Sequence, residues 1–360
     1  MIKRILYTLL IMFPVLASAQ INTDRVMAIG RNALYFEDYV LSIQYFNQVI
    51  NAKPYLSDPY FYRGLAKINL DDFQGAESDC SEAIERNPFV VSAYQVRGLA
   101  RIQQNNFAGA IEDYTKALEF DPENIGVWHN MALCRIRQED YKGAKNDLDK
   151  LIAISPRYTK AYLMRGEVDL KQKDTLAAEK DFGKAIEIDR YDADTWASRA
   201  ILRLQQQRYK DAEADFDHAI RLSTRNSGVY INRALARYHQ NNLRGAMSDY
   251  DIALDIDPNN FIGHYNRGLL RAQVGDDNRA IQDFNFVIEM EPDNMMAIFN
   301  RGLLLDQTGD YKGAIKDYST VINEYPNFLL GYQYRAQARR KIGDVKGADA
   351  DEFKVLKAQL

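Results

Sequence analysis

A spacing of 34 residues recurs through nearly the whole chain and constrains its fold more than any other feature. Prolines stand at positions 54, 88, 122 and 156, and the series resumes at 258, 292 and 326. Glycine or alanine keeps the same spacing from Gly30 to Ala336, and an alanine follows twelve residues after nearly every one. A period of this length is typical of arrays in which one supersecondary unit stacks on the next.

Ten repeats cover the chain from residue 23 to residue 360 without an insertion, nine of 34 residues and a last one of 32. Their predicted bounds are 23–56, 57–90, 91–124, 125–158, 159–192, 193–226, 227–260, 261–294, 295–328 and 329–360. Position 4 of a repeat is usually a large aromatic residue, as in Tyr60, Tyr94 and Trp128. Positions 8 and 20 are small, position 24 is mostly aromatic and position 32 is mostly proline. This pattern resembles the tetratricopeptide repeat family, and the resemblance implies an all-α fold, a right-handed solenoid of helix-turn-helix repeats.

The spacing within one repeat has a physical explanation. Positions 4, 8 and 11 lie on one stripe of a first helix, and positions 20, 24 and 27 lie on one stripe of a second. Small side chains at 8 and 20 let the two helices approach closely as an antiparallel hairpin. Proline at 32 ends the second helix because it has no backbone N–H and restricts the residue before it. Each hairpin leaves apolar surface that its neighbour must cover, so the repeats stack.

The first nineteen residues predict a separate element. Lys3 and Arg4 precede an apolar run from Ile5 to Leu16, and the triplet Ala17, Ser18 and Ala19 follows as a small-residue cleavage site. This order is typical of a secretory signal peptide, and it predicts an exported chain of residues 20–360 in the periplasm or cell envelope, or secreted. The alternative is an N-terminal membrane anchor. No integral membrane segment is predicted after removal of the signal peptide.

Composition excludes one large class of partner. The 46 lysines and arginines are interleaved with 50 acidic residues, which gives a formal net charge of −4. Nucleic-acid binding requires clusters of uncompensated basic residues, so it is not expected. The two cysteines, Cys80 and Cys134, fall in repeats two and four, and we predict that both are free packing thiols because a solenoid brings together mainly adjacent repeats.

Opposite charges recur at two positions. Position 7 is arginine in eight repeats and position 23 is aspartate in nine. Both positions flank the packing stripe on the same side, so we predict structural ion pairs within each repeat, with only Asp147 left unpaired opposite Met131. The alternative is that these arginines bind a phosphate or carboxylate ligand. The predicted pairs are Arg63 with Asp79, Arg97 with Asp113, Arg165 with Asp181, Arg199 with Asp215, Arg233 with Asp249, Arg267 with Asp283, Arg301 with Asp317 and Arg335 with Asp351.

A second stripe of the first helix, at positions 2, 5, 9 and 12, is the candidate binding site. The resemblance implies that this stripe lines the concave surface on which extended peptides usually bind. Asparagine recurs beside it at position 6, so the groove combines apolar side chains with amides that can bond a peptide backbone. The alternative is that some of the apolar residues pack against the next repeat. The candidate groove residues are Phe61, Leu65, Asn130, Ile231, Asn232, Leu235, Tyr265, Asn266, Leu269, Phe299, Asn300 and Leu303.

No pattern of catalytic or metal-binding residues is present in the sequence. The four histidines lie in different predicted helices without metal-ligand spacing, and no nucleophile or phosphate-loop motif occurs. We therefore predict no enzyme activity, cofactor or metal, and a scaffold that binds a protein or peptide partner. The alternatives are a module that binds an envelope polymer, such as peptidoglycan or polysaccharide, and an accessory subunit of an outer-membrane assembly or export machine.

The two ends of the array receive separate expectations. Repeat ten has Glu352 at position 24, where an aromatic residue is usual, and it ends in a lysine-containing helix. We expect the outer face of this repeat to be a polar cap. Repeat one has Ile29 and Tyr45 at the two charge-pair positions, which is consistent with a docking edge or with a variant cap. Self-association through exposed edges is left open.

Overall fold

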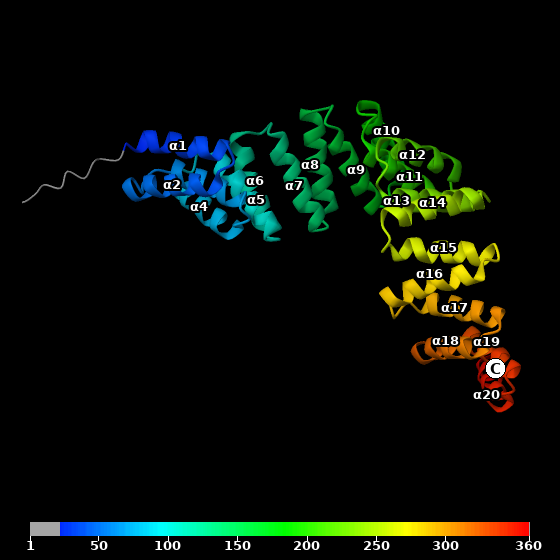
Figure 1. Cartoon of the computed structure of the whole chain (residues 1–360). Helices are drawn as coiled ribbons and strands as arrows, with labels where there is room; N and C mark the ends of the chain where they lie inside the picture. Colours follow the sequence, from blue (N-terminus) through cyan, green and yellow to red (C-terminus); the bar gives the residue numbers. More distant parts are fainter. Residues whose placement is uncertain (1–21, 360) are drawn as a thin grey trace, which may run out of the picture. The chain divides into compact units, whose positions relative to one another are not determined.

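The computed structural model describes residues 22–359, and within this range every regular element is an α-helix (Figure 1). The predicted signal peptide, residues 1–19, lies outside the described residues. The helices are α1 Thr23–Tyr35, α2 Tyr39–Ala52, α3 Asp58–Ile68, α4 Phe73–Arg86, α5 Val91–Gln103, α6 Phe107–Phe120, α7 Ile125–Arg137, α8 Tyr141–Ile154, α9 Thr159–Lys171, α10 Thr175–Ile188, α11 Ala193–Gln205, α12 Tyr209–Leu222, α13 Ser227–His239, α14 Leu243–Ile256, α15 Phe261–Gln273, α16 Asp277–Met290, α17 Met295–Thr308, α18 Tyr311–Glu324, α19 Leu329–Lys341 and α20 Val345–Gln359. None of these helices is long and apolar enough to span a membrane.

The helices form two compact units, one up to Lys173 with α1 to α9 and one from Asp174 with α10 to α20. Within each unit, every helix packs on the next one along the chain. The predicted all-α fold of stacked helix-turn-helix repeats is therefore confirmed.

The turn inside each hairpin is built the same way in all ten repeats. One residue adopts a positive φ: seven non-glycine residues from Glu37 to Asn241, then Gly275, Gly309 and Gly343. An Asp or Asn usually follows and caps the second helix, as where the Asp72 carboxylate accepts a hydrogen bond from the Gly75 N–H at 2.9 Å. The left-handed residue reverses the chain and the cap satisfies a free N–H of the next helix.

Small residues at position 8 bring the two helices of a hairpin together. A Cβ atom on Gly98 would lie 2.8 Å from the Tyr114 ring, and one on Gly302 would lie 2.9 Å from the Tyr318 ring. Both tyrosines are fully buried. The ring at position 24 therefore occupies the space that a larger side chain at position 8 would need.

Positions 3 and 10 of the first helix seal the junction with the preceding repeat. Val127 and Cys134 of α7 belong to the same buried cluster as Tyr114 and Ala117 of α6. The corresponding residues of α17, Ala297 and Leu304, pack on Phe284 and Val287 of α16. This apolar contact is repeated along each compact unit and holds one hairpin on the next.

The two cysteines are free and buried, as predicted. Burial raises the pKa of Cys80 to about 12 and that of Cys134 to about 11, because the thiolate is poorly solvated at these sites. Both thiols therefore stay protonated at neutral pH and act as packing groups.

Candidate functional site

The recurring arginine and aspartate lie against each other on one flank of the hairpins. Arg301 donates from Nε and Nη2 to the Asp317 carboxylate at 2.8 and 2.7 Å, a bidentate contact. The eighth predicted pair, Arg165 and Asp181, has its members in different compact units. The structure brings together the other seven predicted pairs: Arg63 with Asp79, Arg97 with Asp113, Arg199 with Asp215, Arg233 with Asp249, Arg267 with Asp283, Arg301 with Asp317 and Arg335 with Asp351.

The same arginines also reach the preceding repeat, a contact that the sequence analysis does not predict. Arg301 uses Nη1 to donate to the side chain of Asn285 at 2.8 Å, so one guanidinium joins two hairpins. At Arg199 the corresponding residue is Gly183, which has no side chain to accept. The acceptors at this position, number 25 of the preceding repeat, are Asn47, Ser81, Asp149, Asp217, Asp251, Asn285 and Ser319.

A second cation, at position 11, was missed by the sequence reasoning. Arg237 donates from Nη1 to Asp249 at 2.9 Å and from Nε to Glu213 of the preceding repeat at 2.8 Å. The signal was present in the sequence, because position 11 is basic in most repeats and lies one helical turn after position 7. The helical spacing alone places position 11 on the packing stripe, which conceals its second role. The cations are Lys67, Arg101, Arg135, Arg203, Arg237, Arg271 and Arg339.

The prediction that Asp147 is unpaired is wrong for the same reason. Arg135, at position 11, donates to Asp147 from Nε at 2.7 Å. Burial nevertheless raises the pKa of Asp147 to about 6, with Arg135 opposing the rise. Since Met131 occupies position 7, the carboxylate has one guanidinium partner, where five other repeats supply two.

Replacing Met131 with arginine is expected to lower the pKa of Asp147 by about one pH unit or more, because it adds the second guanidinium. The folded-state pKa of about 6 lies above the ordinary value of 3.8. The contribution of Asp147 to stability therefore improves as the pH falls through 6 toward 4, and the substitution weakens this gain. The measurement is a ¹³C NMR titration of the Asp147 carboxyl group. Met131→Leu is the uncharged control, and an unchanged pKa in Met131→Arg would contradict the explanation.

The arginines are engaged in the scaffold and do not form an open anion site. In the seven pairs above, each guanidinium holds a buried carboxylate, and in six of them it also reaches an acceptor of the preceding repeat. The carboxylates already neutralise the positive charge that a phosphate would require. The candidate functional surface is therefore sought on the other side of the first helices. Among residues 22–359, no group of His, Cys, Asp and Glu side chains is placed to hold a metal ion.

We use the term groove face for the side chains at positions 2, 5, 6 and 9 of the first helices. At position 2, α15, α17 and α19 present Ile262, Met296 and Leu330, which are 50 to 58% exposed. Leu269, at position 9 of α15, is 40% exposed. Phe61, Leu65, Asn130, Asn232, Leu235, Tyr265, Asn266, Asn300 and Leu303 are half-buried. The sequence reasoning included position 2 in the stripe but did not select these three residues.

Two candidate residues are buried in the scaffold and do not form an open groove floor. Phe299 packs edge to face on Phe328, and its ring also lies 5.8 Å from those of Tyr318 and Tyr334. Ile231 belongs to the buried cluster around Tyr250 and Leu270. The alternative in which groove residues pack against the next repeat is therefore correct for these two positions.

Polar groups on the groove face also contact one another between repeats. Asn300 donates from Nδ2 to the Tyr265 hydroxyl at 3.2 Å. This bond holds the amide of α17 against the preceding first helix, α15, and fixes its orientation. The amide oxygen of Asn300 keeps its capacity to accept a hydrogen bond from a ligand.

An apolar hollow of about 400 Å³ adjoins the groove face beside Met296. It is formed where α17 begins, α18 ends and the chain turns into α19. Its apolar walls are Met295, Met296, Phe299, Val321, Tyr325 and Phe328, and Asp293 and Asn294 also line it. The hollow is suited to one or two apolar side chains of a bound segment, with polar groups at its edge for the segment's backbone.

Family comparisons agree with this architecture. Models of the TPR repeat and of the tetratricopeptide repeat together match residues 98–134, 125–158, 159–192, 198–261 and 265–327. The chain belongs to the tetratricopeptide repeat family, whose members are generally non-catalytic scaffolds for protein or peptide partners. No curated protein matches the sequence significantly.

Solved structures share the fold at low sequence identity. A tetratricopeptide repeat protein from Parabacteroides merdae is 21% identical with a TM-score of 0.53, over 69% of this chain and 98% of that one. The C-terminal part of a TPR repeat-containing protein from Cytophaga hutchinsonii is 17% identical with a TM-score of 0.55, over 66% and 97%. The pilF protein of Pseudomonas aeruginosa is 19% identical with a TM-score of 0.51, over 60% and 97%.

Proposed function

We propose that this chain is a non-enzymatic scaffold that binds an extended peptide segment along the groove face of the second compact unit. The observation that carries the proposal is the row Ile262, Met296 and Leu330. Three successive first helices place a half-exposed apolar side chain at the same position of the repeat. An exposed apolar row of this kind is typical of an interaction surface.

The amides beside this row supply the polar part of the recognition. Asn232, Asn266 and Asn300 recur at intervals of one repeat and are half-buried. An amide both donates and accepts, so each of them can pair with the N–H and C=O groups of an extended backbone. Apolar side chains of the ligand then lie over Met296 and Leu330 and enter the hollow beside Phe299. The amides would thus bind the backbone of the peptide in any sequence, and the hollow would select among its side chains.

We further propose that the scaffold works outside the cytoplasm, in the periplasm or cell envelope. The support is the order of the first nineteen residues: a basic start, an apolar run and the triplet from Ala17 to Ala19. N-terminal sequencing of the exported chain is expected to give Gln20 as the first residue. An uncleaved chain held in the inner membrane would contradict the signal-peptide assignment and support the membrane-anchor alternative.

The peptide-binding proposal is tested with residues 20–360, which contain every described helix. Peptides are selected from a displayed random library, and the affinity of one selected sequence is measured by fluorescence anisotropy. We expect Met296→Glu to weaken binding about ten-fold or more, because a carboxylate replaces apolar contact surface. We expect the combined Asn232→Ala, Asn266→Ala and Asn300→Ala variant to weaken it further.

The control is Phe89→Glu, which changes an exposed apolar residue between α4 and α5 of the other compact unit. It is expected to bind the selected peptide as the unaltered chain does. Selection of no peptide, or equal binding by the Met296 and Phe89 variants, would overturn the proposal. Sedimentation of the chain with purified cell-wall sacculi in the absence of any selected peptide would support the polymer-binding alternative instead.

A further inference from the structure

The last helix, α20, departs from the repeat at two adjacent positions. In repeats eight and nine, position 24 is a buried aromatic residue and position 25 accepts a hydrogen bond from the next repeat, as Tyr318 and Ser319 do. In α20 these positions hold Glu352, which binds Arg340 at 2.7 Å, and Phe353, which cannot accept such a bond. The outer face of α20 therefore lacks the features that receive another repeat of this type.

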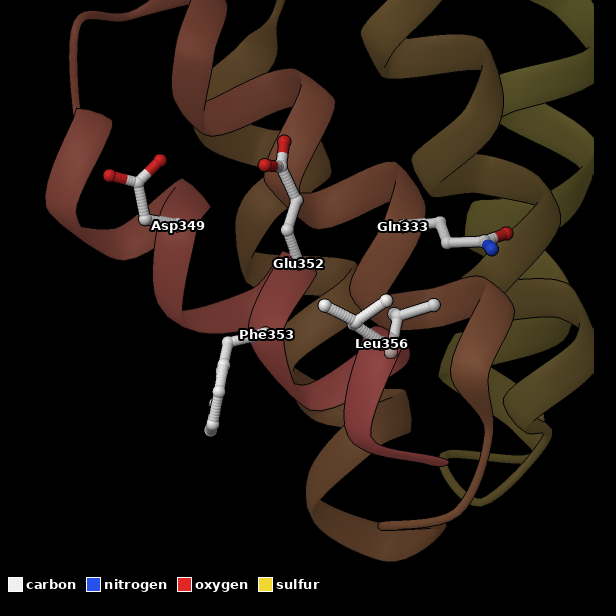
Figure 2. Close-up of a pocket in the computed structure, with 6 residues that line it drawn as sticks. Gln333, Asp349, Glu352, Phe353 and Leu356 are labelled. Atoms are coloured by element: carbon white, nitrogen blue, oxygen red, sulfur yellow. The ribbon is translucent and has the colours of Figure 1, made fainter. Parts of the chain in front are cut away.

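This face is only in part the polar cap that the sequence predicted, because Phe353 and Leu356 lie on it beside Gln333, Asp349 and Glu352. Phe353 is 65% exposed and Leu356 is 56% exposed, whereas Ile322, which corresponds to Leu356 in repeat nine, is 4% exposed. Figure 2 shows Phe353 projecting away from α20, and Leu356 lying beside Gln333 of the neighbouring helix α19. These side chains line a hollow of about 560 Å³. An aromatic and a leucine side by side in water are typical of a contact surface.

The opposite end of the chain cannot occupy this face as a further repeat would. Positions 3 and 10 of a first helix are the buried contacts with the preceding repeat, as Ala297 and Leu304 show. In α1 these two positions are Arg25 and Asn32, and both are exposed. Docking α1 of one copy on α20 of another would bury a guanidinium and an amide against apolar side chains. Head-to-tail growth of the array is therefore disfavoured.

We propose that α20 pairs with α20 of a second copy, antiparallel and about a two-fold axis that passes near Phe353. In such a symmetric contact, residue i of the first copy meets residue j of the second, and residue j of the first meets residue i of the second. Centring the pair on Phe353 places Asp349, which also binds Arg340 of its own copy at 2.8 Å, opposite Lys357, twice by symmetry. A parallel pair would instead place Lys357 against Lys357. Phe353 and Leu356 of the two copies then cover each other, with the Asp–Lys contacts at both ends.

The oligomeric state of residues 20–360 tests this inference, by sedimentation velocity over a range of concentrations. We expect a monomer–dimer equilibrium that the double variant Phe353→Glu, Leu356→Glu shifts to monomer. Both side chains are mostly exposed, so the fold should survive, and circular dichroism verifies it. The control is Phe89→Glu with Leu176→Glu. These two apolar residues lie outside α20 and are more exposed than Phe353 and Leu356, and their substitution should leave the dimer intact.

A charge exchange tests the antiparallel register. In the Lys357→Asp variant, two carboxylates lie opposite each other at both ends of the helix pair. Their repulsion should raise the dimer dissociation constant about ten-fold or more. Adding Asp349→Lys reverses both partners and should return the constant to within about three-fold of the original. A monomer at the highest soluble concentration, a dimer that survives the Phe353–Leu356 double variant, or no rescue by the exchange would each overturn the proposal. None of these outcomes depends on peptide binding at the groove face.

Discussion

Asp317→Asn is expected to lower the free energy of unfolding of the repeat formed by α17 and α18 by about 3 kcal/mol. The Asp317 side chain is almost fully buried and accepts two hydrogen bonds from Arg301. The amide of asparagine has lost the charge and directs an NH₂ group toward the guanidinium. Arg301 then keeps its charge in a half-buried site without a carboxylate to balance it.

Removing both partners should be milder. In the double variant Arg301→Met, Asp317→Leu no charge is left unpaired, and a loss of about 1 kcal/mol or less is expected. Repeat one shows that a hairpin of this chain can form without either charge, since it has Ile29 at position 7 and Tyr45 at position 23. Hydrogen exchange of α17 and α18 is the suitable measurement, since an array of repeats need not unfold in one step. Equal destabilisation by the single and the double variant would reject a charge-balance role for the pair.

Gly98→Leu is expected to destabilise the hairpin of α5 and α6 by about 3 kcal/mol, because even a Cβ atom there would lie 2.8 Å from the buried Tyr114 ring. The leucine can be placed only if the ring moves or the helices separate. Gly98→Ala should cost far less. In repeat seven an alanine, Ala234, already occupies position 8 opposite a buried tyrosine, Tyr250.

Thermal and urea unfolding followed by circular dichroism compare the three chains. We expect the unaltered chain and Gly98→Ala to have similar free energies of unfolding, and Gly98→Leu to have a much lower one. If leucine were tolerated as well as alanine, close approach of the two helices at position 8 would not be what selects a small residue there.

The sequence predicted the hairpins because each one depends on local spacing. The contact between a glycine at position 8 and an aromatic ring at position 24 involves one repeat only, as Gly302 and Tyr318 show. Burial of Phe299 and Ile231 was not predictable in the same way. It depends on how the next repeat packs, and Phe299 meets Phe328 and Tyr334, which come more than two dozen residues later.

The charge network was predictable in part. The Arg–Asp pairs were predictable because both members recur on the same flank of one hairpin. Lys145 and Asp169 form an ion pair between consecutive repeats, with Nζ and Oδ1 2.5 Å apart. Glu77 and Arg101 occupy the corresponding positions earlier in the chain and also form an ion pair, but with the two charges exchanged. A search for one residue type at each position of the repeat misses this ion pair, because the acidic and basic residues have exchanged places.

The arginines at positions 7 and 11 and the exposed residues at positions 2 and 9 lie on opposite sides of each first helix. Hydrogen bonds on the side away from the groove face thus join one hairpin to the next, such as those of Arg233 to Asp249 and to Asp217 of the preceding repeat. If the groove face binds a peptide as we propose, substitutions at Met296 or Leu330 would change ligand preference and leave these hydrogen bonds in place. Descendants of one such framework are free to diverge in what they recognise without having to solve the folding problem again.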